Sequence, residues 1–294
     1  MNNSCQPRPV ICCVLIAADL EAASSAYCDW LFQSVTRRFT LDEDSARAIG
    51  YPGLAGAAAA GLANRRGSEW LLIIEAPDAT PRNPLNTHGW LAQEILVEDV
   101  DSLVASLSDS PFDVLRPPAD LDVSDRIRAS QVRGPAGEIL YLTELKGPVP
   151  PFDLPRCDAP VDHLFIPVLS TPDREASLGD YQVLGASEGM RFDTRISVVN
   201  QELGLPLEQR HPVATLQLKG PALIEIDHIS AATPAPSGLC LGTACIVLSA
   251  NIDSGPGTMS PSQGPFQGLT LQPRTGSAGE HFALACSSQN SHTI

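Results

Sequence analysis

Apolar runs of strand length alternate with amphipathic stretches in an order that repeats along the chain. The run "VICCVLIAA" is followed by a helical pattern that starts after Asp19 and extends to Phe32, and then by strand patterns that end in "EWLLIIEA". An apolar run of this length is typical of a buried strand, and aspartate is a preferred residue before the first turn of a helix. The first strands of the four copies begin near residues 10, 90, 163 and 243. This periodicity predicts an α+β fold of four βαβββ modules.

The four copies differ in their middle parts. In the first, "GLAGAAAAGLANRRG" predicts a flexible or helical insertion. In the second, a helix "DSLVASLSDS" starts after Asp99 or Asp101. In the third, "RISVVNQ" reads as a polar strand. The fourth contains "SGPGTMSPSQGPFQG", which is too rich in glycine, proline and serine to form a regular helix.

A proline-rich segment separates the second copy from the third. "KGPVPPFDLPRCDAPVD" holds five prolines in 17 residues and has no helical periodicity. The domains predicted from it are residues 8–146 (modules one and two) and 161–287 (modules three and four), joined by a linker at 147–160. A single module leaves a bare sheet edge and an exposed apolar face, so two modules paired edge to edge are expected to form a cup. Two cup-shaped domains follow from four modules.

Composition excludes several classes of partner. The formal charge of -15 gives no basic surface for nucleic acid or for an anionic membrane. No apolar stretch approaches the roughly 20 residues of a transmembrane helix. The eight cysteines are dilute and contain no CxxC pair, which predicts reduced thiols in a cytoplasmic protein.

Two segments of the second copy resemble a known superfamily. "VEDVDSLVASL" (97–107) and "GPAGEILYLTEL" (134–145) resemble the first strand, helix and final hairpin of the vicinal oxygen chelate superfamily. That superfamily includes glyoxalase I, bleomycin-resistance proteins and extradiol dioxygenases. The resemblance implies metal ligands at two places in each module, a His or Gln near the start of the first strand and a Glu on the last strand. An imidazole and a carboxylate there suit Fe, Mn, Zn or Ni.

By that resemblance, only the third module carries both metal ligands, His163 and Glu225. A third ligand would have to come from outside the motif, for example from His211, His281 or Glu208. The other modules depart from the pattern: the corresponding residues are Cys12 or Cys13 with Glu75, Ala92 or Gln93 with Tyr141, and Ala244 to Ile246 with Ala283. The lack of ligands in the fourth module argues against a standard extradiol dioxygenase.

Further candidates come from polar residues close to the predicted cups. Tyr141 and His88 are candidate catalytic residues beside Glu225, although a packed tyrosine and a solvent-exposed loop histidine are the simpler alternatives. Glu225 is either a metal ligand, a general base of raised pKa, or the partner of an arginine such as Arg195. The candidate substrate-binding residues are Arg195, Ser197, Asn200 and His211, which could equally belong to an ordinary polar surface.

Together these observations predict an enzyme that acts on a small oxygenated, possibly aromatic, metabolite in the C-terminal cup with a divalent metal. Lewis-acid polarisation with Glu225 shuttling a proton is the mechanism that the resemblance implies. The alternative is a metal-free binding protein of the bleomycin-resistance type. A homodimer is expected from the flat outer faces of the sheets. The N-terminal pair of modules could also serve dimerisation alone.

Overall fold

The computed structural model describes residues 8–122, 124–252 and 257–287. The first module contains β1 (Val10–Ala17), α1 (Leu20–Trp30), β2 (Ser34–Thr40), α2 (Glu43–Ala48), β3 (Ala58–Ala63) and β4 (Glu69–Glu75). The second contains β5 (Gly89–Val97), α3 (Val100–Ser106), β6 (Asp113–Leu121), β7 (Ser124–Arg133) and β8 (Ile139–Leu145). Single 3₁₀ turns lie at Pro52–Leu54, Leu107–Asp109 and Gly264–Phe266.

The third module contains β9 (Val161–Thr171), α4 (Arg174–Gln182), β10 (Ser187–Arg195), α5 (Ser197–Glu202), β11 (Arg210–Gln217) and β12 (Leu223–His228). The fourth contains β13 (Gly242–Ser249), β14 (Leu269–Thr275) and β15 (His281–Ser287). In its described part the fourth module has no α-helix, as its glycine, proline and serine content predicts; residues 253–256 of that stretch lie outside the described residues. The four-module α+β fold is confirmed.

One aspartate starts the main helix of each of the first three modules. Asp19, Asp99 and Asp173 have extended backbones, and their carboxylates accept hydrogen bonds from backbone N–H groups three residues later. These bonds satisfy donors that a helix N-terminus otherwise leaves free. The shared cap fixes a common register: residues at equal distances before these aspartates occupy equivalent positions in their first strands.

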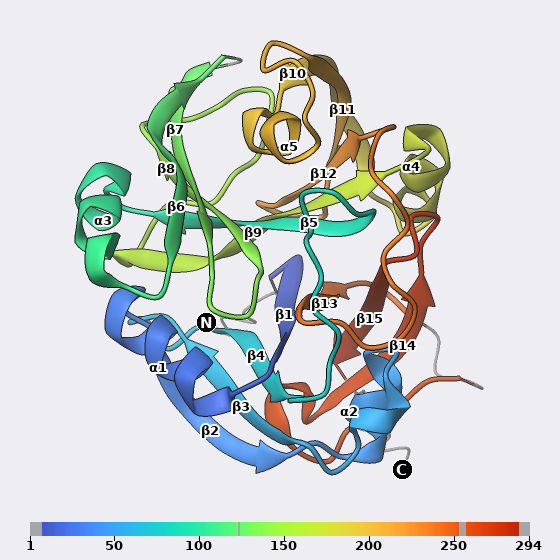
Figure 1. Cartoon of the computed structure of the whole chain (residues 1–294). Coiled ribbons are helices and arrows are strands. Elements are labelled where there is room, and N and C mark those ends of the chain that lie inside the picture. The colour runs from blue at the N-terminus through green and yellow to red at the C-terminus, as the bar shows by residue number, and fades with distance from the viewer. Residues whose placement is uncertain (1–7, 123, 253–256, 288–294) are drawn as a thin grey trace, which may run out of the picture.

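The modules pair differently from the sequence prediction. β1 pairs antiparallel with β13, which gives a seven-stranded sheet of modules one and four, here called the 1–4 cup. β5 pairs antiparallel with β9, which gives an eight-stranded sheet of modules two and three, the 2–3 cup. The 2–3 cup fills the upper half of Figure 1 and the 1–4 cup the lower half. The expected pairing of module one with two and three with four is therefore wrong.

The proline-rich segment is irregular, as predicted, but it does not join separate cups. Residues 147–160 contain no helix or strand and connect β8 to β9, two strands of the same sheet. Its Phe152 and Leu154 pack against apolar side chains of the 2–3 cup. The segment therefore forms part of the covering of that cup.

Two local predictions also need correction. The stretch 53–67 forms the 3₁₀ turn, strand β3 and a turn, not a flexible or helical insertion. The segment "RISVVNQ" forms most of helix α5 instead of a strand. Val198 and Val199 are buried in the 2–3 cup, so tertiary packing overrides the β propensity of these branched residues.

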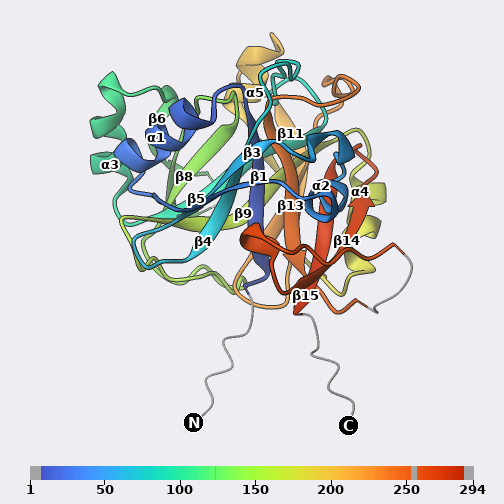
Figure 2. The same cartoon turned by 90° about the horizontal axis from the view of Figure 1, so that it is seen from below.

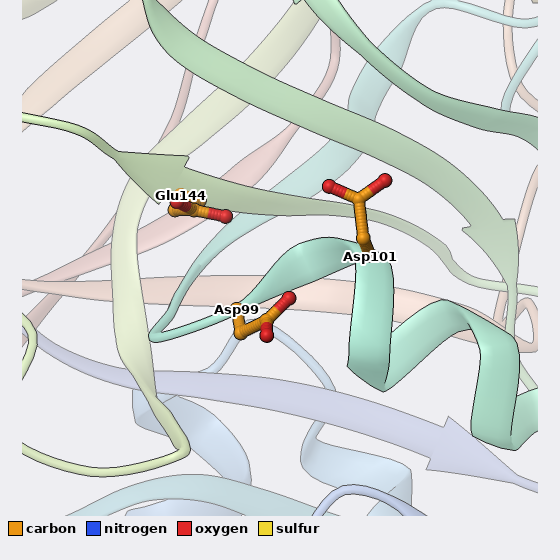
Figure 3. Close-up of side chains that lie close together, drawn as sticks. All are labelled: Asp99, Asp101 and Glu144. Atoms are coloured by element: carbon orange, nitrogen blue, oxygen red, sulfur yellow. The ribbon is translucent and has the colours of Figure 1, made fainter.

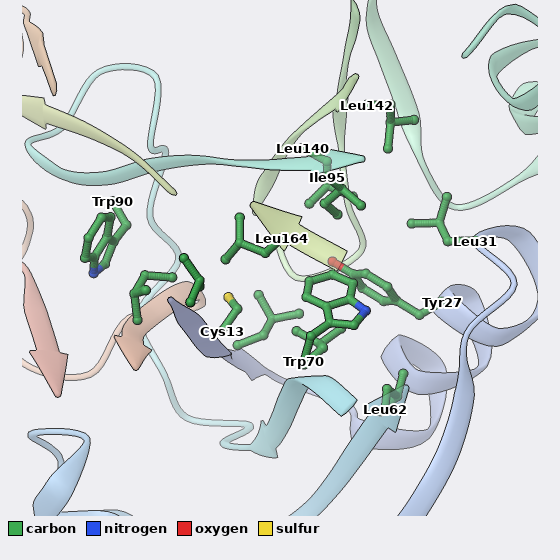
Figure 4. Close-up of a cluster of buried hydrophobic side chains, with 14 of the residues drawn as sticks. Cys13, Tyr27, Leu31, Leu62, Trp70, Trp90, Ile95, Leu140, Leu142 and Leu164 are labelled. Atoms are coloured by element: carbon green, nitrogen blue, oxygen red, sulfur yellow. The ribbon is translucent and has the colours of Figure 1, made fainter. Parts of the chain in front are cut away.

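The two sheets pack back to back, and helices of both cups contribute side chains to the apolar layer between them. One apolar cluster joins β1 and β4 to β5, β8 and β9, with Tyr27, Trp70 and Trp90 among its large side chains (Figure 4). Figure 2 shows α1 and α3 together at one end of the molecule and α4 at the other. No helix in the described ranges is both long and apolar enough to cross a membrane.

The interiors of the two cups differ in chemistry. The 1–4 cup is filled by apolar side chains from its own strands, from α2 and from the turn containing Phe266. In the 2–3 cup, apolar residues cover only part of the interior, and acidic side chains occupy the rest. The 2–3 cup thus contains a cavity that leaves room for a ligand.

Candidate functional site

Three carboxyl groups and a phenol meet on the floor of the 2–3 cup. Glu94 on β5 lies beside Tyr141 on the parallel strand β8, and Glu225 and Asp227 lie on β12. Alternate residues of a strand face the same side, and Ile224 and Ile226 belong to the cluster behind the sheet. Glu225 and Asp227 therefore both face the cup, where all four groups line a cavity of about 280 Å³.

These groups are buried and mostly lack partners. Asp227 is fully buried, and among the described residues neither of its carboxylate oxygens has a hydrogen-bond partner. The Tyr141 hydroxyl is likewise buried without a partner. Glu94 accepts a hydrogen bond of 2.8 Å from the Thr143 hydroxyl. Because a buried polar group without a partner is costly, these atoms mark a place that a ligand can complete.

Burial and mutual repulsion shift the titration of all three carboxyl groups. Desolvation raises the pKa of Glu225 above the usual carboxyl range. Desolvation, followed by the charge of Glu225, raises the pKa of Glu94, and a hydrogen bond from Thr143 opposes this rise. The pKa of Asp227 is raised well above its ordinary value by desolvation and then by Glu225 and Glu94. The cavity therefore holds protonated carboxyl groups next to one that can exchange its proton near neutral pH.

The mouth of the cavity is bridged by an ion pair between its two edge strands. Arg195, at the end of β10, contacts Asp122 after β6 with an N–O distance of 2.8 Å, and it contacts Glu208 at 3.0 Å. β6 and β10 are the two edges of the 2–3 sheet, and they face each other in Figure 1. Arg195 is thus engaged at the rim, and no ion pair joins it to Glu225 among the described residues.

The comparisons with known proteins identify the fold. Glyoxalase I from Zea mays superposes with a TM-score of 0.62 at 14% identity, over 94% of this chain and 91% of that chain. A putative dioxygenase from Bacillus subtilis subsp. subtilis str. 168 gives a TM-score of 0.61 at 10% identity, over 96% of this chain and 87% of that chain. The chain has the vicinal oxygen chelate fold. No protein-family model matches the sequence, and no curated protein does.

His163 does not join Glu225 in this version of the vicinal oxygen chelate fold. Glu225 pairs with Val168 on β9, five residues beyond His163, which is about 16 Å along a strand. Counted from the helix caps, His163 corresponds to Gly89 at the start of β5, and Ile166 corresponds to Ala92. The His163 ring instead contacts the Asp162 carboxylate at 2.7 Å. The predicted metal pair is therefore not assembled.

The remaining predicted residues divide between the site and its scaffold. Tyr141, Glu225, Ser197 and Arg195 line the 2–3 cavity. Asn200 is buried, donates to the backbone oxygens of Leu207 and Gln209, and contacts the His211 ring at 2.6 Å. This pair holds the end of α5 and does not line the cavity. His88 lies in the wall of a different cavity. Glu208 is engaged by Arg195, and His281 lies in the other sheet.

Two acidic residues of the site, Glu94 and Asp227, were not among the site residues predicted from the sequence. Glu94 lies within the apolar strand "GWLAQEILV", where a charged residue interrupts an otherwise buried run. Asp227 follows Glu225 at a spacing of two, which places it on the same face of the strand. Either signal could have indicated an acidic cup. Both residues lie outside the positions that the superfamily motif covers.

A separate acidic group lies outside the cup at the start of α3. Asp99, Asp101 and Glu144 are the one set of three in the described part of the chain whose ligand atoms all lie within 4.8 Å and could hold a metal ion (Figure 3). Each already has a local partner. Asp99 caps α3, Asp101 pairs with Arg128 at 2.7 Å, and Glu144 accepts from the backbone N–H of Val100. The group therefore serves to hold the helix N-terminus.

The donor set of the 2–3 cup does not fit the metal that the vicinal oxygen chelate fold implies. Iron, zinc and nickel sites in proteins typically use imidazole, and Ala92 and Ile166 occupy the first-strand positions. The available donors are carboxylate and phenol oxygens alone. Manganese accepts carboxylate oxygens, but within the described residues Glu94, Glu225 and Asp227 do not bring three ligand atoms within 4.8 Å of one another. The cup is better suited to acid–base chemistry.

Proposed function

We propose that the 2–3 cup binds a small oxygenated metabolite and transfers a proton on it, with Glu225 as the general base. The observation that carries this proposal is Asp227, whose two fully buried oxygens have no partner in the part of the chain that the structure describes and line the same cavity as Glu225. Groups whose environments separate their pKa values can divide the roles of acid and base. Asp227 stays protonated and donates a hydrogen bond, whereas Glu225 exchanges a proton.

The proposed step is a proton shift next to a carbonyl group. The Glu225 carboxylate takes a proton from the carbon adjacent to the carbonyl, and the electron pair of that C–H bond moves into the carbonyl, giving an enolate oxygen. The Asp227 carboxyl and the Tyr141 hydroxyl donate hydrogen bonds to this oxygen. On a hydroxy-ketone, the Asp227 carboxyl then gives its proton to the enolate oxygen and takes the proton of the neighbouring hydroxyl, while Glu225 returns its proton to the former carbonyl carbon. The hydroxyl-bearing carbon becomes the new carbonyl, so atoms and charge balance. A positioned base of this kind typically accelerates proton transfer by about 10²–10⁴-fold.

Two features of the cup support an enclosed reaction. Phe192 and Ile196 line the side of the cavity and offer an apolar surface to an organic ligand, including an aromatic one. The Arg195–Asp122 ion pair spans the mouth, so ligand entry requires it to open. The proposed reaction needs this pair to limit the entry of water, which would otherwise compete for the donors on the floor.

A metal-free binding protein is the second candidate. The observation in its favour is the apolar pair Ala92 and Ile166, where the superfamily holds ligands of a catalytic metal. In that case the same cavity sequesters its ligand, and the carboxyl groups, whose pKa values are raised, act only as hydrogen-bond donors.

Hydrogen exchange separates the two candidates. The wild type and Glu225→Gln are incubated in D₂O with hydroxy-ketones, hemithioacetals and catechols, and ¹H NMR follows deuterium uptake and product. We expect uptake and isomerised product with the wild type, and a loss of at least about 100-fold with Glu225→Gln. The matched control Glu98→Gln, at an exposed position, keeps full activity. Ligand-induced thermal shifts without uptake in the wild type would favour the binding protein, and activity abolished by EDTA would contradict the metal-free step.

A further inference from the structure

A second cavity lies apart from the 2–3 site, where two of the three connections between modules meet. The segments 76–88 and 229–241 run side by side, with parallel bridges between Thr80 and Cys240 and between Thr87 and Thr233. Beneath them a cavity of about 280 Å³ opens, and its walls come from both connections and from the starts of β5, β13 and β15. Neither Glu225 nor Asp227 lines it.

Arg82 is the charged anchor of this cavity. Its Nε donates to the Thr87 hydroxyl at 2.9 Å, and its Nη2 donates to the backbone oxygens of His88 and Trp90 at 2.9 and 3.1 Å. Gly89 has a positive φ of 102°, and a Cβ atom there would lie 3.2 Å from Nη2. The glycine therefore lets the guanidinium approach the backbone closely. Its remaining group, Nη1, makes no hydrogen bond within the described part of the chain.

The positive charge of Arg82 has no acidic partner among the residues that the structure describes. The chain carries 34 acidic and 19 basic residues, yet no carboxylate forms an ion pair with Arg82 in the described ranges. The one acidic residue in the cavity wall, Glu280, accepts hydrogen bonds from the Tyr181 hydroxyl and from the backbone N–H of Ala278. Burial also raises the pKa of Glu280 to about 7, which weakens its charge. A largely buried cation without a counter-ion is unfavourable unless an anion completes it.

The other walls indicate which kind of anion fits. Trp90, Pro234 and Pro236 supply apolar surface, whereas His88, His281 and Thr243 supply polar groups. Burial lowers the pKa of both histidines, so they are neutral near pH 7 and add no positive charge to the cavity. One cation beside an apolar wall matches a singly charged organic anion better than a multiply charged one.

We infer that this cavity binds a small organic carboxylate, with the carboxylate on Nη1 of Arg82 and the apolar part against Trp90 and the prolines. This site is independent of the proton transfer proposed for the 2–3 cup. Guanidinium and carboxylate form strong charge-assisted hydrogen bonds, and partial exclusion of water strengthens them.

Benzoate, acetate and inorganic phosphate serve as probes of the full-length protein by isothermal titration. We expect saturable binding of benzoate that is weakened at least about tenfold in Arg82→Gln. Ser237→Trp tests the cavity without touching the guanidinium, because Ser237 is an exposed residue of its wall; it also weakens binding. Arg156→Gln, at an exposed arginine, and Glu225→Gln, in the other cavity, leave benzoate binding unchanged.

Cys240 gives a second readout that does not depend on activity. It lies in the cavity wall and is partly exposed, so bound benzoate slows its alkylation, measured by peptide mass spectrometry at pH 8.5. Protection is expected in the wild type and lost in both cavity variants. Three results would overturn the inference: no benzoate binding to the wild type, equal binding to Arg82→Gln and Ser237→Trp, or phosphate binding as tightly as benzoate.

Discussion

The Tyr27 hydroxyl on α1 donates a hydrogen bond of 2.7 Å to Oε1 of Glu138, in the hairpin before β8. Tyr181 on α4 makes the same bond, also of 2.7 Å, to Glu280 in the hairpin before β15. In both cases the helix belongs to one cup and the hairpin to the other. The two bonds therefore fasten the sheets together at equivalent places on either side of the molecule.

The first of these contacts predicts a stability that depends on pH. Desolvation raises the pKa of the buried Glu138 from its ordinary 4.5 to about 7. The contribution of Glu138 to the free energy of unfolding is therefore present in full below about pH 4.5 and is lost as pH rises through 7. The loss is on the order of 3 kcal/mol. Denaturant unfolding from pH 4 to pH 8 should show a smaller decline in Glu138→Gln than in the wild type.

The comparison between variants isolates this residue from the other carboxyl groups. Glu98→Gln, at an exposed position of the same module, is the matched control and should follow the wild-type curve. Parallel curves for the wild type and Glu138→Gln would show that Glu138 does not titrate in this range.

Removing one acid from the 2–3 cup should stabilise the fold. Asp227 has a pKa raised well above 3.8, so keeping it buried costs more free energy as pH rises above the ordinary carboxyl range. Asp227→Asn removes this cost, and thermal unfolding at pH 8 should show a gain of about 1 kcal/mol or more, which disappears at pH 4. Proton exchange on substrate should fall in the same variant. A destabilised variant at pH 8 would argue against the unpartnered carboxyl group.

The ion pair at the cavity mouth should control exchange more than stability. Because Arg195 and Asp122 are both well exposed and screened by solvent, Arg195→Ala should leave the free energy of unfolding nearly unchanged. Opening of the mouth should raise both the association and the dissociation rate of ligand in stopped-flow experiments. The exchanged pair, Arg195→Asp with Asp122→Arg, should restore slow exchange; rates that stay fast in it would remove the role of the ion pair.

The packed and open cups should respond differently to the loss of an aromatic side chain. Phe266 is fully buried inside the 1–4 cup, and Phe266→Ala should cost about 3–5 kcal/mol because it leaves a void. Phe192 is half-buried at the wall of the 2–3 cavity, and Phe192→Ala should cost clearly less while weakening ligand binding. Equal costs in chemical denaturation would contradict this difference between the cups.

The sequence predicts the modules well because their signals are local. An aspartate cap after an apolar run locates each of the first three helices, and the hairpin "GPAG" locates the end of module two. The pairing of modules depends on which sheet edges meet. The four first strands are similarly apolar, so no local residue distinguishes β5–β9 from β1–β5.

The candidate site was predicted in part, for a comparable reason. Glu225 and Tyr141 follow from their positions after a hairpin, and both lie in the cavity. His163 was predicted as a metal ligand because it is a histidine near the start of a strand, and its distance from the helix cap was not used. β9 begins two residues before it, so His163 lies too near the start of the strand to reach Glu225. Asn200 and His211 were predicted as substrate-binding residues, but their mutual hydrogen bond gives them a structural role. The cytoplasmic location and the homodimer stay predictions.

The exchange of partners between modules has a consequence for dividing the chain. A cut within 147–160 would divide each sheet between two fragments. One fragment would keep β1 and β5, and the other would keep their partners β13 and β9. Neither fragment can build a whole cup from its own strands. We expect the two halves to reassemble when they are co-expressed, because each sheet needs strands from both. The protein is therefore a suitable scaffold for a split reporter.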